Sequence, residues 1–242
     1  MSKKWLDYRK PVIYTGKGVS MMNPSFSVYM AGELFDHKDL VGNALLAEHI
    51  HRISQGRYRC LLPQNIEMTG SPPGDIRNQD LKHLIRSDLS IFNFDGTELD
   101  SGTVVEFMVA KFLDIPSVIF RSDFRSSGDQ GKKGDDWNLM CSFYPRTRIV
   151  RYNAIKAYQE AVRTIEPVEE AIRIFYEKMS SVIIENLDSV RRTPPLLKGK
   201  QQQQEALYSW ALKFPGGGFE ALCSEPSFIK NTVAAKIDKG VA

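Results

Sequence analysis

The sequence predicts an α/β fold in which a five-stranded parallel sheet is flanked by helices and followed by a helical extension. This prediction depends on two observations. Between residues 26 and 152, short apolar runs alternate with segments of helical periodicity, which is the pattern of βαβ units around a parallel sheet. After residue 152 no strand is evident, and the chain is rich in Glu, Lys, Ala and Ile. We therefore expect an α/β domain over residues 1–152 and a helical extension of unknown role over residues 153–242.

Five apolar runs are predicted to form the strands. The first run ends at Gly32, and the run at 90–94 leads directly into Asp95 and Gly96. The apolar character of the run at 90–94 favours a central position in the sheet. Five strands connected in this way indicate a flavodoxin-like, or Rossmann-like, sheet. The predicted strands cover residues 26–31, 57–62, 90–94, 116–120 and 148–152.

Segments of helical spacing connect the predicted strands. They cover residues 40–53, a region around 81–89 and residues 101–113. Residues 122–137, after the fourth strand, are polar, contain three glycines and are predicted to form a loop. On the helix at 101–113, the residues expected to face the core are Val104, Val105, Met108, Val109, Phe112 and Leu113.

The C-terminal extension is predicted to consist of helices. Residues 154–190 have a helical composition with one interruption at Pro167, which indicates two helices or one kinked helix. Residues 191–204 contain Pro-Pro and four consecutive glutamines and are predicted to be a linker. A short helix over residues 205–214 precedes three consecutive glycines. No motif in this extension indicates a function.

Composition excludes several classes of protein. The 32 Lys and Arg residues against 29 Asp and Glu give a net charge of +3, which is too small for the basic surface of a nucleic-acid-binding protein. No apolar run approaches the roughly 18–20 residues of a membrane span, and the N-terminus has no signal-like apolar segment. Three scattered cysteines without a CxxC pair predict free thiols. We expect a soluble, cytoplasmic protein that binds neither polynucleotides nor membranes.

Common cofactor and metal motifs are missing from the sequence. The segment Gly16-Lys17-Gly18 lacks the spacing of a phosphate-binding loop, and no GxGxxG follows a predicted strand. His49 and His51 point in different directions on a helix and form no metal-ligand pattern with the other histidines. We therefore expect neither a metal nor an organic cofactor.

Polar residues follow two of the predicted strands. In an open parallel sheet, ligands bind outside the carboxyl ends of the strands, so the residues at these ends are candidates for a site. Tyr29 lies near the end of the first strand, and the stretch after the third strand leads to Glu106. The residues one helical turn from Glu106 are small, which leaves room for a ligand beside its carboxylate. They are Gly102, Thr103 and Ala110.

Each candidate also has an ordinary structural interpretation, which spacing alone leaves open. Glu106 can be a solvated glutamate on the helix surface. Asp100 stands where a helix N-cap is expected, and Asp80, ahead of the apolar spacing of the second helix, can be a surface or capping residue. Tyr29 can be a core aromatic residue whose hydroxyl reaches the edge of the sheet.

Four motifs occur in order between residues 26 and 152. They are Val28-Tyr29-Met30-Ala31-Gly32; Asn78-Gln79-Asp80-Leu81; Phe94-Asp95-Gly96 with Asp100-Ser101-Gly102-Thr103-Val104-Val105-Glu106; and Asn138-Leu139-Met140. In order and spacing they resemble the nucleoside 2-deoxyribosyltransferase family. The resemblance covers about half of the chain and does not extend to the helical tail. The family pattern has a second glycine where this chain has Val104.

The resemblance implies a role for each matching side chain. Glu106 would be the nucleophile, Tyr29 would position its carboxylate, and Asp80 would form a hydrogen bond with the base or protonate it. Asp100 would hold the 5′-hydroxyl group of the sugar. Asn138 of a neighbouring subunit would complete the pocket, which implies a homo-oligomer with shared active sites.

The resemblance also implies the reaction and the remaining substrate-binding positions. Gly32, Asp95 and Gly102 would line the pocket. The substrates would be 2′-deoxyribonucleosides and free purine or pyrimidine bases. A carboxylate below the anomeric carbon can trap the sugar as a glycosyl-enzyme, and a second base then recaptures it with net retention. This chemistry requires no metal and no cofactor.

Two other functions stay open from the sequence. A deoxynucleoside 5′-monophosphate N-glycosidase of the same superfamily would need groups that receive a phosphate. Asp100 disfavours this hydrolase because a carboxylate repels a phosphate, whereas Ser101 favours it. A non-catalytic nucleotide-binding sensor would keep the fold without turnover. The sensor is disfavoured by the joint presence of the four residues Tyr29, Asp80, Asp100 and Glu106, because a binder needs no nucleophile.

Overall fold

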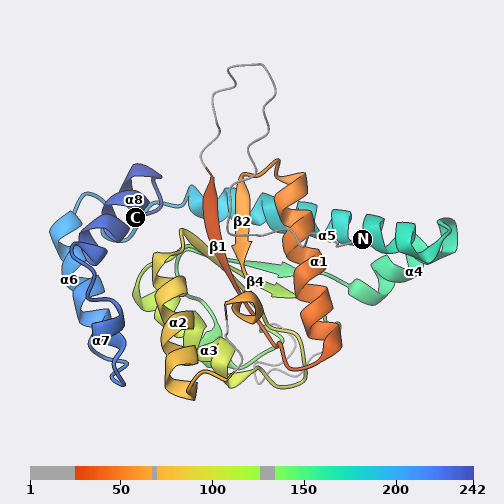
Figure 1. Cartoon of the computed structure of the whole chain (residues 1–242). Coiled ribbons are helices and arrows are strands. Elements are labelled where there is room, and N and C mark those ends of the chain that lie inside the picture. Colours follow the sequence, from red (N-terminus) through yellow and green to blue (C-terminus); the bar gives the residue numbers. More distant parts are fainter. Residues whose placement is uncertain (1–24, 67–69, 126–133) are drawn as a thin grey trace, which may run out of the picture.

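The strands of the computed structural model form one parallel sheet, as predicted (Figure 1). The structure describes residues 25–66, 70–125 and 134–242. Within these ranges the strand order is β2-β1-β3-β4-β5, and every neighbouring pair is parallel. The central position predicted for the third strand is therefore confirmed. The strands are β1 (Phe26–Ala31), β2 (Tyr58–Leu61), β3 (Leu89–Asn93), β4 (Ser117–Arg121) and β5 (Thr147–Arg151).

The first three helices connect consecutive strands. The first begins at His37 rather than at residue 40, because the Asp36 carboxylate accepts hydrogen bonds from two backbone N–H groups and caps it. The second begins at Pro73, ahead of the apolar spacing, because proline fits the first turn of a helix. These helices are α1 (His37–Ile53), α2 (Pro73–Arg86) and α3 (Ser101–Phe112), with short 3₁₀ helices η1 (Pro63–Asn65) and η3 (Leu139–Cys141).

The C-terminal extension is helical, as predicted. Pro167 separates its first two helices, because proline does not continue a helix. The predicted linker is shorter than expected, since the next helix begins at Gln201. Glutamine is a good helix former, and the side chain of Gln204 is buried. The helices are α4 (Ala154–Thr164), α5 (Val168–Arg191), α6 (Gln201–Ala211), α7 (Phe219–Leu222) and α8 (Phe228–Asp238).

Helices cover both faces of the sheet. One face packs against α1 and α5, and its buried cluster joins Val28, Ile91 and Val118 of the strands to Ile183 and Leu187 of α5. The other face packs against α2 and α3. Although α5 lies beyond residue 152, it therefore belongs to the core of the sheet.

The face of α3 that meets the sheet differs from the predicted one. Val105 and Phe112, which were expected to face the core, are 56% and 61% exposed. Phe107 is instead fully buried, and its ring meets the rings of Phe92 and Phe94 edge to face, at centroid distances of 5.2 and 5.6 Å. These aromatic contacts set the rotation of α3 about its axis. The buried residues of α3 are Thr103, Phe107, Val109 and Ala110.

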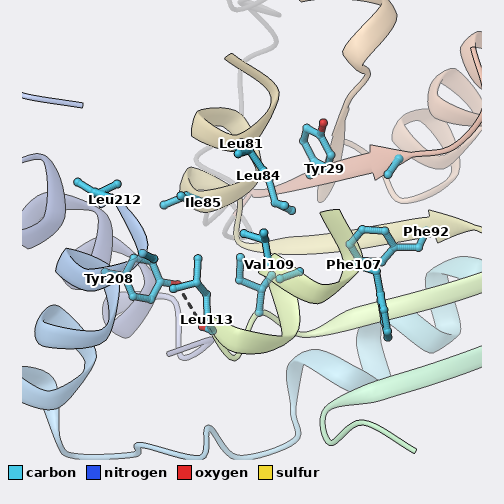
Figure 2. Packing of buried hydrophobic residues seen from close by; sticks show 14 of the residues in the cluster. Tyr29, Leu81, Leu84, Ile85, Phe92, Phe107, Val109, Leu113, Tyr208 and Leu212 are labelled. Carbon is cyan, nitrogen blue, oxygen red and sulfur yellow. Dashed lines mark hydrogen bonds between the residues drawn. The ribbon is translucent and has the colours of Figure 1, made fainter. Parts of the chain in front are cut away.

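Helices α6–α8 pack beside α2 and α3 (Figure 1). Tyr208 of α6 and Leu212, the residue that follows α6, share one buried cluster with Ile85 of α2 and with Leu113, the residue that follows α3 (Figure 2). The hydroxyl group of Tyr208 donates a hydrogen bond to the carbonyl oxygen of Leu113 at 3.4 Å. The C-terminal extension therefore contributes to the packing on both faces of the sheet.

Lys236 of α8 is a buried cation in this packing. Its ammonium group donates a hydrogen bond to the carbonyl oxygen of Ser87, which ends α2, and lies 5.9 Å from the centre of the Tyr208 ring. Burial lowers the pKa of Lys236 to about 7, although the neighbouring carboxylate of Asp88 acts in the opposite direction.

We expect Lys236 to make the free energy of unfolding rise with pH above about 7. Above this pH the folded state holds a neutral lysine, whereas the unfolded chain keeps the proton up to the ordinary pKa of 10.5. The unfolded state then binds more protons, and one proton contributes at most about 1.4 kcal/mol per pH unit. Lys236→Met should remove this contribution. Urea titrations of both proteins at about pH 7 and pH 8.5 give the free energy of unfolding at each pH. If this free energy changes equally with pH in the wild type and in Lys236→Met, the prediction is contradicted.

The cysteines agree with the predicted free thiols. Cys60, Cys141 and Cys223 form no disulfide, and burial raises the pKa of each thiol. No helix in the three described ranges has both the length and the apolar character needed to cross a membrane. The N-terminus, where the sequence predicts no signal peptide, lies outside the described residues.

Candidate active site

Tyr29 and Glu106 meet at the carboxyl edge of the sheet. Tyr29 is buried in β1, and its hydroxyl group donates a hydrogen bond to Oε1 of Glu106 at 2.5 Å. Glu106 lies on α3 next to buried Phe107, with its side chain half-buried. The structure thus contains the contact that the family resemblance implies between residues 77 positions apart. It also fits the ordinary interpretation of Tyr29, a core ring whose hydroxyl reaches the edge of the sheet.

Asp100 caps the helix that carries Glu106. Its Oδ2 atom accepts hydrogen bonds from the backbone N–H of Thr103 at 2.7 Å and from the Thr103 hydroxyl at 2.8 Å. The capping role considered in the sequence analysis is therefore present. Within the described residues, Oδ1 of Asp100 has no hydrogen-bond partner. The same carboxylate can thus cap α3 with one oxygen and accept a hydrogen bond from a ligand with the other.

Two of the predicted pocket glycines have tight surroundings. A Cβ atom on Gly32 would lie 2.9 Å from Cβ of Asn93, so only glycine allows β1 and β3 to approach this closely at their ends. A Cβ atom on Gly102 would lie 3.2 Å from Oδ2 of Asp100. Because Gly102 precedes Glu106 by one helical turn, its missing side chain leaves space beside that carboxylate.

Asp95 joins the ends of two strands. Its carboxylate accepts hydrogen bonds from the backbone N–H of Ser122 at 2.5 Å, the Ser122 hydroxyl at 2.7 Å and the backbone N–H of Asp123 at 2.8 Å. These contacts attach the loop after β4 to the loop after β3. They explain an aspartate at this position without a ligand, and the substrate contact expected from the resemblance stays a prediction.

Asp80 lies in the middle of α2 and is half-buried. It does not cap this helix, because α2 begins at Pro73 after Pro72 in the capping position. The capping interpretation of Asp80 is therefore wrong. Leu81 and Leu84 of the same helix belong to the buried cluster that contains the ring of Tyr29 (Figure 2). This packing places α2 beside the strand that carries Tyr29.

Asn138 lies beside α3, on a different side of this helix from Glu106. It caps η3, with its Oδ1 atom accepting a hydrogen bond from the backbone N–H of Met140 at 2.9 Å. It borders a cavity of about 620 Å³ between α3 and η3. The lining residues are Thr97, Glu98, Leu99, Ser101, Val104, Val105, Trp137, Asn138, Met140 and Cys141.

The cavity and the Glu106 carboxylate lie on different sides of α3. Successive residues of an α-helix are about 100° apart, so Ser101, Val104 and Val105 share one side of α3, and Gly102 and Glu106 share another. Only the first group lines the cavity within the described part of the chain. The structure therefore does not bring Asn138 and Glu106 of one chain together.

Carboxylates gather at the edge of the site. Glu33 follows Gly32 at the end of β1, and its pKa is raised first by burial and then by nearby carboxylates. These carboxylates belong to Asp39, Asp100, Asp36 and Asp95. Sequence reasoning assigned no role to Glu33, although its position directly after a strand was a signal. Among the described residues, no group of His, Cys, Asp and Glu side chains is arranged to hold a metal ion.

Comparisons with known proteins identify what the chain is similar to. Residues 28–140 match the sequence model of a family described as Nucleoside 2-deoxyribosyltransferase. A comparison with curated proteins found no match. Similar solved structures include a conserved protein from Enterococcus faecalis V583, with 26% identity over 52% of this chain and 91% of that chain and a TM-score of 0.44.

Two further similar structures have lower identity. A 2-desoxiribosyltransferase from Leishmania mexicana has 19% identity over 57% of this chain and 98% of that chain, with a TM-score of 0.42. A CMP N-glycosidase from Clostridium botulinum has 13% identity over 57% of this chain and 97% of that chain, with a TM-score of 0.37.

Proposed function

We propose that the chain exchanges the base of 2′-deoxyribonucleosides, because its residues 28–140 match the sequence model of the nucleoside 2-deoxyribosyltransferase family. The reaction is a retaining double displacement through a glycosyl-enzyme on Glu106. One observation carries this proposal: the hydroxyl group of Tyr29 holds the Glu106 carboxylate at 2.5 Å, at the edge of the sheet where α/β proteins bind ligands.

The first half of the reaction breaks the bond between the base and the anomeric carbon. The bonding electron pair leaves with the base, and the carboxyl group of Asp80 supplies the proton that neutralises it. Glu106 attacks the anomeric carbon from the opposite face and forms an ester with the sugar. Tyr29 orients the Glu106 carboxylate for this attack through its hydrogen bond to Oε1.

The second half reverses these steps with a new base. A nitrogen atom of the incoming base attacks the anomeric carbon, the ester bond to Glu106 breaks, and the proton of that nitrogen returns to Asp80. Two inversions at the same carbon give net retention. Asp100 binds the 5′-hydroxyl group of the sugar through Oδ1, and Asn138 of a neighbouring subunit completes the pocket. The proposed active unit is therefore a homo-oligomer.

A base-exchange assay tests this function. Deoxyinosine and adenine are incubated with the protein, and free base and nucleosides are separated by chromatography. We expect deoxyadenosine and hypoxanthine to form in equal amounts. Release of hypoxanthine without deoxyadenosine would indicate a hydrolase, and no conversion of any 2′-deoxyribonucleoside would favour a binding protein.

The carboxylates at the edge of the site favour nucleosides over 5′-monophosphates. Asp100 and Glu33 lie close enough to interact, and a phosphate beside them would meet like charge. This observation favours the transferase over the monophosphate N-glycosidase.

Asp100→Ser should reduce the preference for nucleosides. Serine is also a good N-cap, so α3 should keep its start while the carboxylate that repels phosphate is removed. We expect the ratio of kcat/KM for deoxyinosine to that for its 5′-monophosphate to fall about tenfold, which is about 1.4 kcal/mol. Asp100→Asn, which removes only the charge, is the matched control. If the wild type already prefers monophosphates, the N-glycosidase function replaces the transferase.

A further inference from the structure

The three glycines after α6 form a left-handed turn against α2. Gly216, Gly217 and Gly218 have φ angles of 59°, 55° and 81°, a region that other residues rarely adopt. A Cβ atom on Gly217 would lie 2.8 Å from Nη2 of Arg77. The turn directs two carbonyl oxygens at α2: that of Gly217 accepts from Nδ2 of Asn78 at 2.8 Å, and that of Gly216 accepts from Nη2 of Arg77 at 3.4 Å.

Asn78 is the buried centre of this contact. Its side chain is only 3% exposed, and both ends of the carboxamide are used. Oδ1 accepts a hydrogen bond from Nη2 of Arg77 at 2.8 Å, and Nδ2 donates to Gly217. A buried amide with both ends satisfied has one favoured position, because any displacement leaves a polar group unpaired.

The C-terminal helices hold α2 at two further points. Nζ of Lys82 donates to the carbonyl oxygen of Leu222 at 2.9 Å and pairs with Glu225 at 3.0 Å. Lys236 donates to the carbonyl oxygen of Ser87 at the end of the helix. Contacts from the middle of α2 to its C-terminal end therefore fix both its position and its rotation.

Asp80 lies on the flank of α2 away from these contacts. At about 100° per residue, Asp80 lies nearly opposite both Asn78 and Lys82, with the core-facing Leu81 and Ile85 between them. A rotation of α2 by about 10° would move a side-chain atom about 5–6 Å from the axis by roughly 1 Å. A misplacement of about 1 Å in a catalytic group can lower the rate roughly 100-fold.

We propose that the C-terminal extension positions the proton donor: Asn78 and the Gly216–Gly218 turn hold α2 so that the Asp80 carboxyl group meets the departing base. This inference rests on the proposed function. The proton of Asp80 passes to a nitrogen atom of the base as its bond to the anomeric carbon breaks, and Asp80 keeps the negative charge until the incoming base returns a proton. Asn78 is a positioning residue in this scheme, since it acts through α2 and does not contact the base.

The test compares two leaving bases. The neutral base of deoxyinosine needs a proton as it leaves, whereas the base of 7-methyl-2′-deoxyguanosine is already cationic and leaves without one. Release of each base is measured by chromatography for the wild type, for Asp80→Asn as the reference, and for Asn78→Ala and Gly217→Ala. We expect Asp80→Asn to lower release from deoxyinosine at least 100-fold and from the methylated substrate less than tenfold. Asn78→Ala and Gly217→Ala should show the same selective loss, of about tenfold.

Gly199→Ala is the matched control. Gly199 also lies in the extension with a positive φ angle, 73°, but nothing lies within 4 Å of the position of its Cβ atom. The Gly199→Ala substitution introduces the same kind of backbone strain without touching α2. The ratio of base release from deoxyinosine to base release from the methylated substrate should therefore not change.

Equal loss on both substrates in Asn78→Ala and Gly217→Ala would overturn the inference, because it would show a general loss of structure. Thermal melting identifies a variant that fails to fold. If Asn78→Ala does not fold, the result for Gly217→Ala decides the test, because this variant keeps the buried amide of Asn78. A wild-type protein that releases neither base would refute the proposed function itself, and the inference with it. A wild type active on both substrates, with an unchanged ratio in both variants, refutes the inference alone.

Discussion

Glu106→Ala is expected to abolish base exchange while the fold stays intact. The substitution removes the carboxylate that we propose forms the glycosyl-enzyme, so the loss in kcat should be at least about 1000-fold, or roughly 4 kcal/mol of transition-state stabilisation. The fold should tolerate it, because Glu106 is half-buried beside the core and alanine is the best helix former. The measurement is the exchange of deoxyinosine with adenine, with the melting temperature of the variant as the check on folding.

Tyr29→Phe provides a matched control for Glu106. It removes only the hydroxyl group that donates to Oε1 and leaves the buried ring in place. We expect a smaller loss of about 10–100-fold, because the carboxylate is still present but no longer held. Exchange by Glu106→Ala within tenfold of the wild type would exclude Glu106 as the nucleophile. A slow 2-fluoro-substituted deoxynucleoside adds an independent measurement, since mass spectrometry should find its sugar on the peptide that contains Glu106.

The sheet could be predicted from the sequence because its signal is local. The strands follow short apolar runs, and the run at 90–94 contains no charged residue because β3 is buried between two other strands and two layers of helices. The element ends differ by one or a few residues where capping decides them. Asp36 begins α1 earlier than the apolar spacing indicates, and Pro73 does the same for α2.

The rotation of α3 could not be predicted in the same way. Counting apolar residues selected a stripe that includes Val105 and Phe112, but tertiary contacts select the stripe of Phe107. The rings of Phe92 and Phe94 lie at the end of the central strand, and only the folded structure shows that Phe107 meets them. The contact between Tyr29 and Glu106 came from the family resemblance, since no local pattern joins residues 77 positions apart.

The contacts of the C-terminal extension with α2 could not be predicted from local patterns either. Three consecutive glycines indicate a turn. Nothing in the sequence shows that this turn contacts Asn78, which lies 139 positions before Gly217 in the chain. The contacts of Asp95 with Ser122 and Asp123 are of the same kind. Both are hydrogen bonds between distant segments, and they become visible only when the sheet brings those segments together.

Asn138, at the start of η3, and Glu106 of α3 lie on different sides of α3, and this placement leads to the second large effect. If Asn138 completes an active site, it must do so for another subunit, because the cavity it borders lies on the flank of α3 away from Glu106. The surface around it is suited to such contact. Met140 and Val105 line the cavity together with Asn138 and are 72% and 56% exposed. Exposed apolar residues that lie close together are typical of protein interfaces.

Mixing two inactive variants should therefore restore activity. Asn138→Ala and Glu106→Ala chains each lack one half of every site in their own oligomers. In a mixed dimer one site loses both residues, and the other draws an intact Asn138 from one chain and an intact Glu106 from the other. In purified mixed dimers one site of two is complete, so about half of the wild-type activity per dimer should return.

The experiment requires that subunits exchange, so the two chains are co-expressed with different affinity tags. Tandem purification then isolates the mixed oligomers, which are assayed for the exchange of deoxyinosine with adenine. Oligomers of either variant alone serve as controls and should stay inactive, since none of their sites is complete. If mixed oligomers are recovered and remain as inactive as these controls, Asn138 does not serve a neighbouring subunit. Its place on the far flank of α3 would then leave it without a part in the reaction.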